Sequence, residues 1–110
     1  MTNQYELLLQ MLQLLEQLVD TATSLNDTVK TSFVEKDLVP LQERQREILS
    51  NLSALDALIK KQPDNEADLS IKELKKDIEI KLNKFQKINN EFLEHVSSHY
   101  RLIGEKKPPL

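Results

Sequence analysis

The stretch "LLLQMLQLLEQLV", residues 7–19, is dominated by leucine, and glutamine and glutamate are its only polar residues. All three residue types favour helices. Beyond this stretch, apolar residues continue at heptad spacing, which is typical of a helix that packs along a seam. The seam positions are Leu8, Met11, Leu15, Leu18, Ala22, Leu25 and Val29. The pattern predicts a helix from about Asn3 to Lys30, with Asn3 and Glu6 as a capping box at its start.

The same helix carries more apolar residues than one seam requires. The additional ones are Leu7, Leu9, Leu12, Leu14 and Val19. Together they make the apolar stripe wider than one partner helix could cover. Core packing accounts for most of this surface, and the remaining strip of apolar residues predicts a site for a partner. We expect an amphipathic helix to bind there, with Leu7, Leu14 and Leu18 as its contacts.

Composition places the whole chain in the all-α class. The chain has 110 residues, enough for one domain, and glycine occurs once, at Gly104. Leucine, glutamine, glutamate and lysine dominate, whereas a sheet protein would need more turn glycine and more β-branched residues. Cysteine is absent, which excludes disulfides, thiolate metal sites and a cysteine nucleophile.

The charge and hydropathy of the chain argue against two classes of partner. The net charge is −3, so the basic surplus typical of nucleic-acid binders is missing. The leucine-rich stretch of residues 7–19 is too short and too polar to insert across a membrane. The first basic residue is Lys30, so the N-terminus lacks the basic region of a signal peptide. The absence of cysteine fits a reducing cytosol.

A second helix is predicted from the stretch "DLVPLQERQREIL", residues 37–49. Asp37 suits the N-cap, and Pro40 then falls in the first turn, where amides have no partner within the helix. The proline therefore marks the start of this helix. Its core-facing stripe consists of Leu38, Leu41, Gln45, Ile48, Leu52, Leu55 and Ile59. The helix should end near Gln62.

The segment "QPDNEADLS", residues 62–70, is the strongest internal break, because it holds a proline and three acids without a basic residue. Ser70 and Glu73 match a capping box for a third helix, which should run to about Ile103. Its stripe consists of Ile71, Leu74, Ile78, Leu82, Phe85, Ile88, Phe92, Val96, Tyr100 and Ile103.

Short connections near residues 31–37 and 62–70 make neighbouring helices antiparallel. The sequence therefore predicts an elongated antiparallel bundle of three long helices, with residues 1–104 as a single domain. Gly104 suits the position that ends many helices, and residues 105–110 are expected to form a mobile tail. A kink or a break within the third helix is an alternative to one continuous helix.

Two clusters of functional residue types each have a plainer interpretation. His95 and His99 stand one turn apart and could grip zinc, but the Glu that follows the first His in metalloproteases is missing. We therefore expect ordinary surface histidines and no metal. Arg44 and Arg46, with their neighbouring glutamates, form either a recognition patch or a solvated face. No catalytic constellation or phosphate-binding loop is recognisable, so we expect neither an enzyme nor a cofactor.

The order of these segments resembles the flagellar type III export chaperones of the FliT and FlgN group. In that group, a long Leu/Gln/Glu-rich helix precedes one with leucines around a Glu-Arg or Glu-Lys step, as in "KDLVPLQERQREILSNLSALDALI", residues 36–59. The third helix carries an Asn/Asp-Glu step followed by leucines, and "INNEFLEHV", residues 88–96, is similar. The likeness covers about residues 4–103, and the chain length suits the shorter FliT type.

The resemblance implies a cytoplasmic bacterial chaperone of flagellum biogenesis and type III protein export. Such proteins hold the amphipathic C-terminal helix of a late substrate, either the filament cap protein or a hook-associated protein, and also engage the export ATPase or the export gate. Arg44 and Arg46 would then face an export component. A separate fourth helix, present in some FliT proteins, is not expected. The alternative is a homodimeric coiled-coil scaffold or adaptor subunit, in which the surplus apolar strip is a permanent self-interface.

Overall fold

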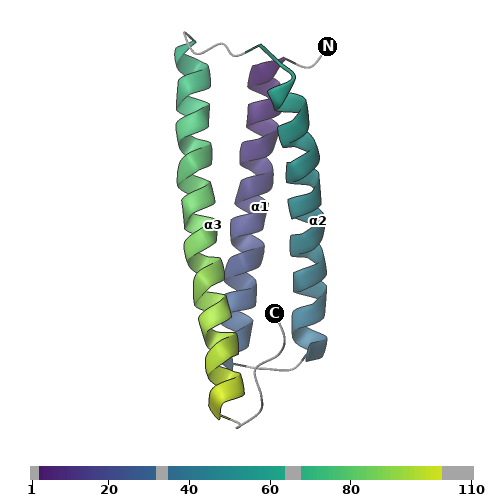
Figure 1. Ribbon diagram of the computed structural model, residues 1–110, viewed down its shortest axis with the longest axis vertical. Helices are drawn as coiled ribbons and strands as arrows, with labels where there is room; N and C mark the ends of the chain where they lie inside the picture. The colour runs from purple at the N-terminus through teal and green to yellow at the C-terminus, as the bar shows by residue number, and fades with distance from the viewer. Residues whose placement is uncertain (1–2, 32–34, 64–67, 103–110) are drawn as a thin grey trace.

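The computed structural model describes residues 3–31, 35–63 and 68–102, without the side chains of Glu35 and residues 99–102. This part of the chain forms three helices and no strand, so the predicted all-α class is confirmed. The helices are α1 (Gln4–Thr31), α2 (Glu35–Lys60) and α3 (Leu69–Leu102), shown in Figure 1. The third helix is continuous, so the alternative of a broken helix is wrong. The predicted end at Gly104 and the tail lie outside the described residues.

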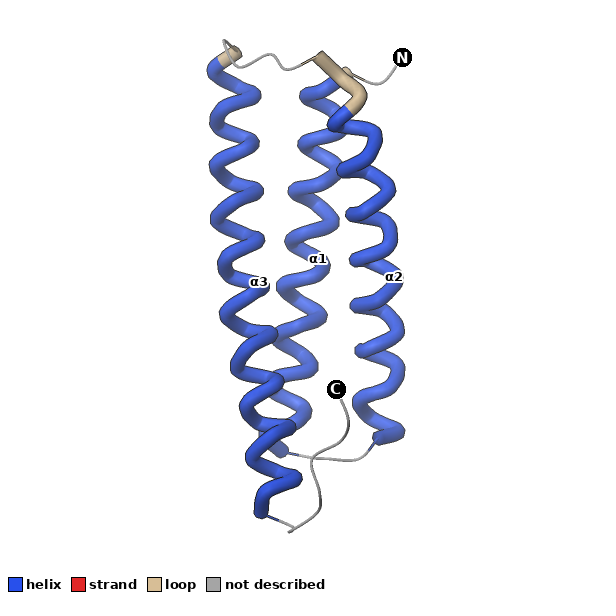
Figure 2. Tube along the Cα trace, viewed as in Figure 1, coloured by secondary structure: helices blue, strands red, loops and turns tan. Residues whose placement is uncertain are grey.

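The three helices run antiparallel to their chain neighbours, side by side along a molecule 55 Å long (Figures 1 and 2). The first helix, α1, packs against both other helices. Within the described residues, no Cα atom of α2 lies within 8 Å of a Cα atom of α3. The bundle is therefore built around α1, and α2 and α3 lie apart on either side of it.

The core follows the predicted heptad seam of α1. Leu15 and Leu18 have no exposed surface, and their neighbours along the seam are also buried, apart from the half-buried Met11. Around α1, three apolar clusters succeed one another along the bundle, and each combines side chains of all three helices. Burial of this apolar surface on α1 is the main force that holds α2 and α3 in place.

The start of α1 agrees with the sequence, whereas the start of α3 does not. The Asn3 side-chain oxygen accepts a hydrogen bond from the Glu6 amide at 2.9 Å, which confirms the predicted N-cap. At the third helix, the Asp68 carboxylate accepts a hydrogen bond from the Ser70 amide at 2.9 Å. The prediction of Ser70 as N-cap is therefore wrong. The N-cap is Asp68, which stands just before Leu69, where the helix begins.

The start of α2 also differs from the prediction, and the difference changes the meaning of its proline. The helix begins at Glu35, so Asp37 lies inside the first turn and is not the N-cap. Pro40 consequently lies in the second turn, where it lacks the amide that would bond the carbonyl of Lys36. The first turn of α2 is anchored to the core by Leu38, which is buried against the end of α1 and against Phe92 of α3.

The second helix ends at Lys60, two residues before the predicted position. The amides of Lys61 and Gln62 donate to the carbonyls of Leu58 and Ile59, at 3.2 and 3.0 Å, and tighten the last turn. The predicted break over residues 62–70 is present between Lys60 and Leu69. None of the helices, over their described residues, has an apolar run long enough to cross a membrane.

Candidate functional site

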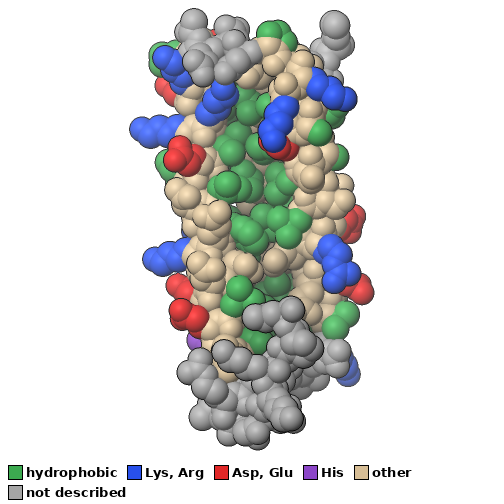
Figure 3. Space-filling view, viewed as in Figure 1, with side chains coloured by type: hydrophobic (Ala, Val, Ile, Leu, Met, Phe, Trp, Pro, Cys, Tyr) green, Lys and Arg blue, Asp and Glu red, His purple; other side chains and the backbone are tan. Residues whose placement is uncertain are grey.

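The separation of α2 from α3 leaves a groove on one face of the bundle, with α1 as its floor. Within this groove lies a hollow of about 520 Å³. Figure 3 looks onto this face, where hydrophobic side chains form a strip between α3 on the left and α2 on the right. The hollow is lined by Met11, Leu15 and Leu18 of α1, by Leu49, Leu52, Ser53 and Asp56 of α2, and by Ile78, Leu82, Phe85 and Gln86 of α3.

The floor of the hollow is apolar and fixed. Leu15 and Leu18 are completely buried beneath the side chains of the walls, and Met11 is half-buried beside them. The polar residues of the lining, Ser53, Asp56 and Gln86, all belong to the walls. A ligand in this hollow therefore meets apolar surface below it and polar groups only at its sides.

Each helix contributes about two turns to the hollow. The lining extends from Met11 to Leu18 on α1, and from Leu49 to Asp56 on α2. On α3 it extends from Ile78 to Gln86. Seven residues of helix correspond to about 10 Å, which is also the distance between positions i and i+7 of any helix. The hollow thus matches the two-turn stripe of an amphipathic helix in length.

Large apolar side chains on the rims are incompletely covered. Leu49 on the α2 wall and Leu82 on the α3 wall are each 41% exposed. Leu93, which is 53% exposed, stands three turns after Leu82 and hence on the same face of α3. Exposed apolar surface that is contiguous and rimmed by polar residues is typical of a binding site.

Lysines gather at one end of the hollow, where α2 ends and α3 begins. Asp56 forms a salt bridge with Lys60 at 3.0 Å, between side chains that are 48% and 76% exposed. On α3, a second and shallower hollow of about 290 Å³ is lined by Ile71, Lys72, Lys75, Lys76 and Glu79. Both rims therefore present lysines at this end of the groove.

Of the residues that the sequence assigned to the binding of a partner helix, Leu14 and Leu18 pack in the same apolar cluster, and Leu7 does not belong to it. Leu18 is on the floor of the hollow, with no exposed surface. Leu7 is buried, and the half-buried Leu14 packs on a cluster that includes Ile48 of α2. The surplus strip on α1 is therefore largely covered by its own neighbouring helices, and the exposed large apolar side chains that line the hollow belong to α2 and α3.

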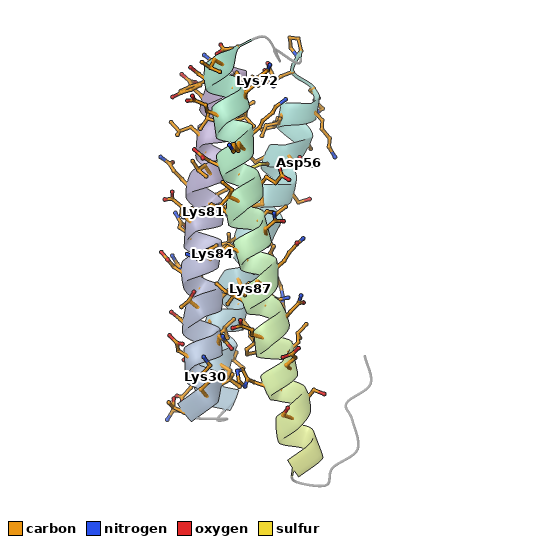
Figure 4. All side chains as sticks on the ribbon, turned by 90° about the vertical axis from the view of Figure 1, so that its left-hand side faces the viewer. Lys30, Asp56, Lys72, Lys81, Lys84 and Lys87 are labelled. Atoms are coloured by element: carbon orange, nitrogen blue, oxygen red, sulfur yellow. The ribbon has the colours of Figure 1, made fainter. Side chains whose placement is uncertain are left out.

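Arg44 and Arg46 are both exposed on α2. Arg46 stands three residues before Leu49, so it lies on the groove side of the helix, whereas Arg44 points elsewhere. On α3, Lys84 lies on another side of the helix from the shallow hollow, whereas Lys87 stands three turns after Lys76 and hence on the same face (Figure 4). His95 is half-buried, the His99 side chain is outside the described residues, and the described residues hold no group of three or more potential metal ligands.

A buried polar contact joins α1 to α3 below the hollow. The Asn26 side-chain amide donates to the Glu91 carboxylate at 3.1 Å, and Asn26 is only 5% exposed. Its carbonyl oxygen and that of Gln45 are buried without a hydrogen-bond partner among the described residues. The hydrogen bond adds a polar contact to the apolar packing between α1 and α3.

Sequence reasoning missed Leu49 and did not foresee the exposure of Leu82. Leu49 lies one position beyond Ile48 in the stripe of α2, and Leu82 had been assigned to the buried stripe of α3. The available signal was the pair Ile48–Leu49, which widens the stripe of α2 on one side.

No protein-family model matches the chain, and no curated protein or solved structure matches it either.

Proposed function

We propose that this protein binds an amphipathic helix of another protein in the groove between α2 and α3. The observation that carries the proposal is the apolar hollow, which has a buried leucine floor and exposed leucines on both rims. A partner that removes this surface from water stabilises the complex by about 25 cal/mol for each Å² of apolar area buried.

A helix suits the groove better than an extended segment. In the described part of the chain, α2 and α3 both pack against α1 and stand apart from each other. An added helix between them would complete a four-helix bundle. A helix satisfies its own backbone hydrogen bonds, which matters because the floor offers only apolar side chains. Anchors at positions i, i+3, i+4 and i+7 would fill the two-turn length of the hollow.

The occupant is better assigned to a different protein than to a helix of a second copy. Outside the groove face, the exposed large apolar residues of the described part are Tyr5, Leu9, Leu58, Leu69 and Ile80. None of the three helices carries three of these at the spacing of an amphipathic stripe. The described part of a second copy therefore has no uncovered stripe outside the groove to insert, and a homodimer through this part would require groove-to-groove contact.

The resemblance to FliT and FlgN proteins suggests which partner helix is bound and in which process. The protein is a bacterial cytosolic chaperone that holds the C-terminal amphipathic helix of a flagellar filament cap or hook-associated protein before secretion. Holding such a helix requires shielding of apolar surface and no chemical step. Arg44 and Arg46, exposed on α2, are then available to the export ATPase or the export gate.

Co-expression with a filament cap protein tests this function. We expect a one-to-one complex in size-exclusion chromatography with light scattering, and its loss in Leu82→Asp. Ile80→Asp is the matched control, because Ile80 is 55% exposed on the same helix but two residues away and hence on another face. Both variants should keep the circular dichroism of the wild type, since neither residue is buried.

Two results would contradict the proposal. A complex that survives both Leu82→Asp and Leu49→Asp would place the ligand elsewhere on the molecule. A protein that is dimeric at every concentration tested, and monomeric after Leu82→Asp, would show that the groove is a self-interface and would favour the scaffold.

A further inference from the structure

The groove is not uniformly charged along its length. At the end where α2 stops and α3 starts, the basic residues are Lys60 of α2, Lys61 directly after it, and Lys72, Lys75 and Lys76 of α3. The acidic residues that line the two hollows at this end are Asp56 and Glu79. Figure 3 shows Lys and Arg side chains on both sides of the hydrophobic strip at its upper end. The lining of the shallow hollow is basic, with three lysines and one glutamate, although the chain as a whole carries a net charge of −3.

The middle of the groove has a different character. Apart from Asp56, its lining consists of apolar residues together with Ser53 and Gln86, which are uncharged. Affinity from apolar burial is therefore available in the middle, and discrimination by charge is available at the lysine-rich end. A ligand that uses both must have an apolar stripe and a negative charge at a defined place beside it.

We propose that the groove selects a partner helix with acidic side chains at the end that lies beside Lys72 and Lys76, a proposal that rests on the helix-binding function above. The lysines attract the acidic end during approach and fix the position of the helix along the groove. A helix with lysines in the same place meets like charge on both rims. The charged rim thereby defines the substrate class as acidic-ended amphipathic helices.

A free anion does not explain the same surface. The lysines are exposed or half-buried at the mouth of a shallow hollow, and the larger hollow beside them is apolar and two helical turns long. An inorganic anion would leave that apolar hollow empty, whereas an acidic-ended helix covers the hollow and neutralises the lysines together. The combination points to a peptide ligand.

Two synthetic helical peptides test the proposal. Both carry the same leucine stripe over two turns, with glutamates in both terminal turns of one peptide and lysines in those of the other. This design makes the result independent of the direction in which the peptide lies. We expect the acidic peptide to bind roughly tenfold more tightly at low salt, and the difference to shrink as salt is added.

Charge reversal on the rim supplies the second arm. The double variant Lys72→Glu/Lys76→Glu should invert the preference between the peptides. The matched control Lys84→Glu/Lys87→Glu has the same change in net charge on the same helix at residues that line neither hollow, and should keep the preference of the wild type.

The outcomes separate this inference from the proposed function. Equal binding of the two peptides, lost in Leu82→Asp, would overturn the charge selection and leave helix binding intact. Inversion of the preference by the Lys84 and Lys87 control as well would reduce the effect to net charge and overturn the selection. Binding unchanged in Leu82→Asp would remove the groove itself as the site.

Discussion

Leu49 of α2 and Leu82 of α3 lie on opposite walls of one hollow, and both leave 41% of their surface exposed above the buried Leu15. Single exposed leucines are common on protein surfaces and need no explanation. Two of them across an apolar hollow have a shared cause, because α2 and α3 stand too far apart for their rims to cover each other. Two sides of α1 are covered by α2 and α3, and the side that faces the groove between them is not covered by a helix of the described part of the chain.

Replacement of both rim leucines by glutamine should leave the fold intact. We expect the free energy of unfolding of Leu49→Gln/Leu82→Gln to stay within about 0.5 kcal/mol of the wild type, as for most surface substitutions. The same variant should bind much less of a fluorescent dye that recognises apolar surface. Urea unfolding and dye fluorescence measure the two effects.

The matched control for that variant is Leu58→Gln/Ile80→Gln. These residues are 49% and 55% exposed on the same two helices, outside the hollow. Dye binding should stay at the level of the wild type in this control. A loss of stability above about 2 kcal/mol in the rim variant would show that the two leucines behave as core residues, and the groove would then be closed in solution.

The floor of the groove should behave in the opposite way. Leu15 is completely buried, so Leu15→Ala should lower the free energy of unfolding by about 2–5 kcal/mol. Phe85 is only half-buried on the α3 wall, so Phe85→Ala should cost less than Leu15→Ala. Equal costs at the two sites, measured by urea unfolding, would contradict the difference in burial.

Leu18 is unsuitable for a binding test, although the sequence favoured it. Its side chain has no exposed surface, so Leu18→Asp would bury a carboxylate in the core and unfold the bundle. Loss of binding in that variant would say nothing about the site. The rim residues Leu49 and Leu82 test the groove without this ambiguity.

Removal of the proline in α2 should stabilise the protein. Pro40 lies in the second turn and cannot donate to the carbonyl of Lys36, so Pro40→Ala restores one backbone hydrogen bond. We expect a gain of roughly 1–2 kcal/mol, because alanine also gives the unfolded chain more freedom and offsets part of the benefit. Amide exchange should become slower in the first two turns of α2. A loss of stability would place Pro40 in the first turn, as the sequence had suggested.

The sequence predicted the helices well because local patterns determine them. The heptad positions of α1, such as Leu15 and Leu18, are buried, and the break between α2 and α3 falls where a proline and acidic residues gather. The helix starts were less accurate. Asp37 and Ser70 are good caps in isolation, but burial of Leu38 and the carboxylate of Asp68 start the helices earlier.

The open face could not be predicted in the same way. Its existence depends on the distance between α2 and α3, which no residue pattern within one helix encodes. On α1, a wide stripe indicates only that more than one neighbour is needed, and two neighbours already cover Leu7 and most of Leu14. The uncovered surface then appears on the neighbours, at Leu49 and Leu82.

The contact between Asn26 and Glu91 predicts that the stability of the variant Asn26→Asp depends on pH. Asn26 is buried and donates to the Glu91 carboxylate at 3.1 Å, so Asn26→Asp would replace the donor with a second carboxylate of the same shape. We expect a loss of roughly 1.5–3 kcal/mol at neutral pH, the range for a hydrogen bond to a charged group. Protonation of either carboxylate relieves the repulsion, so the loss relative to wild type should shrink as the pH falls. The control Asn26→Leu removes the polar group and leaves Glu91 half-exposed, so its smaller cost should not depend on pH. Urea unfolding of the three proteins at several pH values measures this, and an Asn26→Asp loss that is the same at every pH would show that the two side chains do not meet in solution.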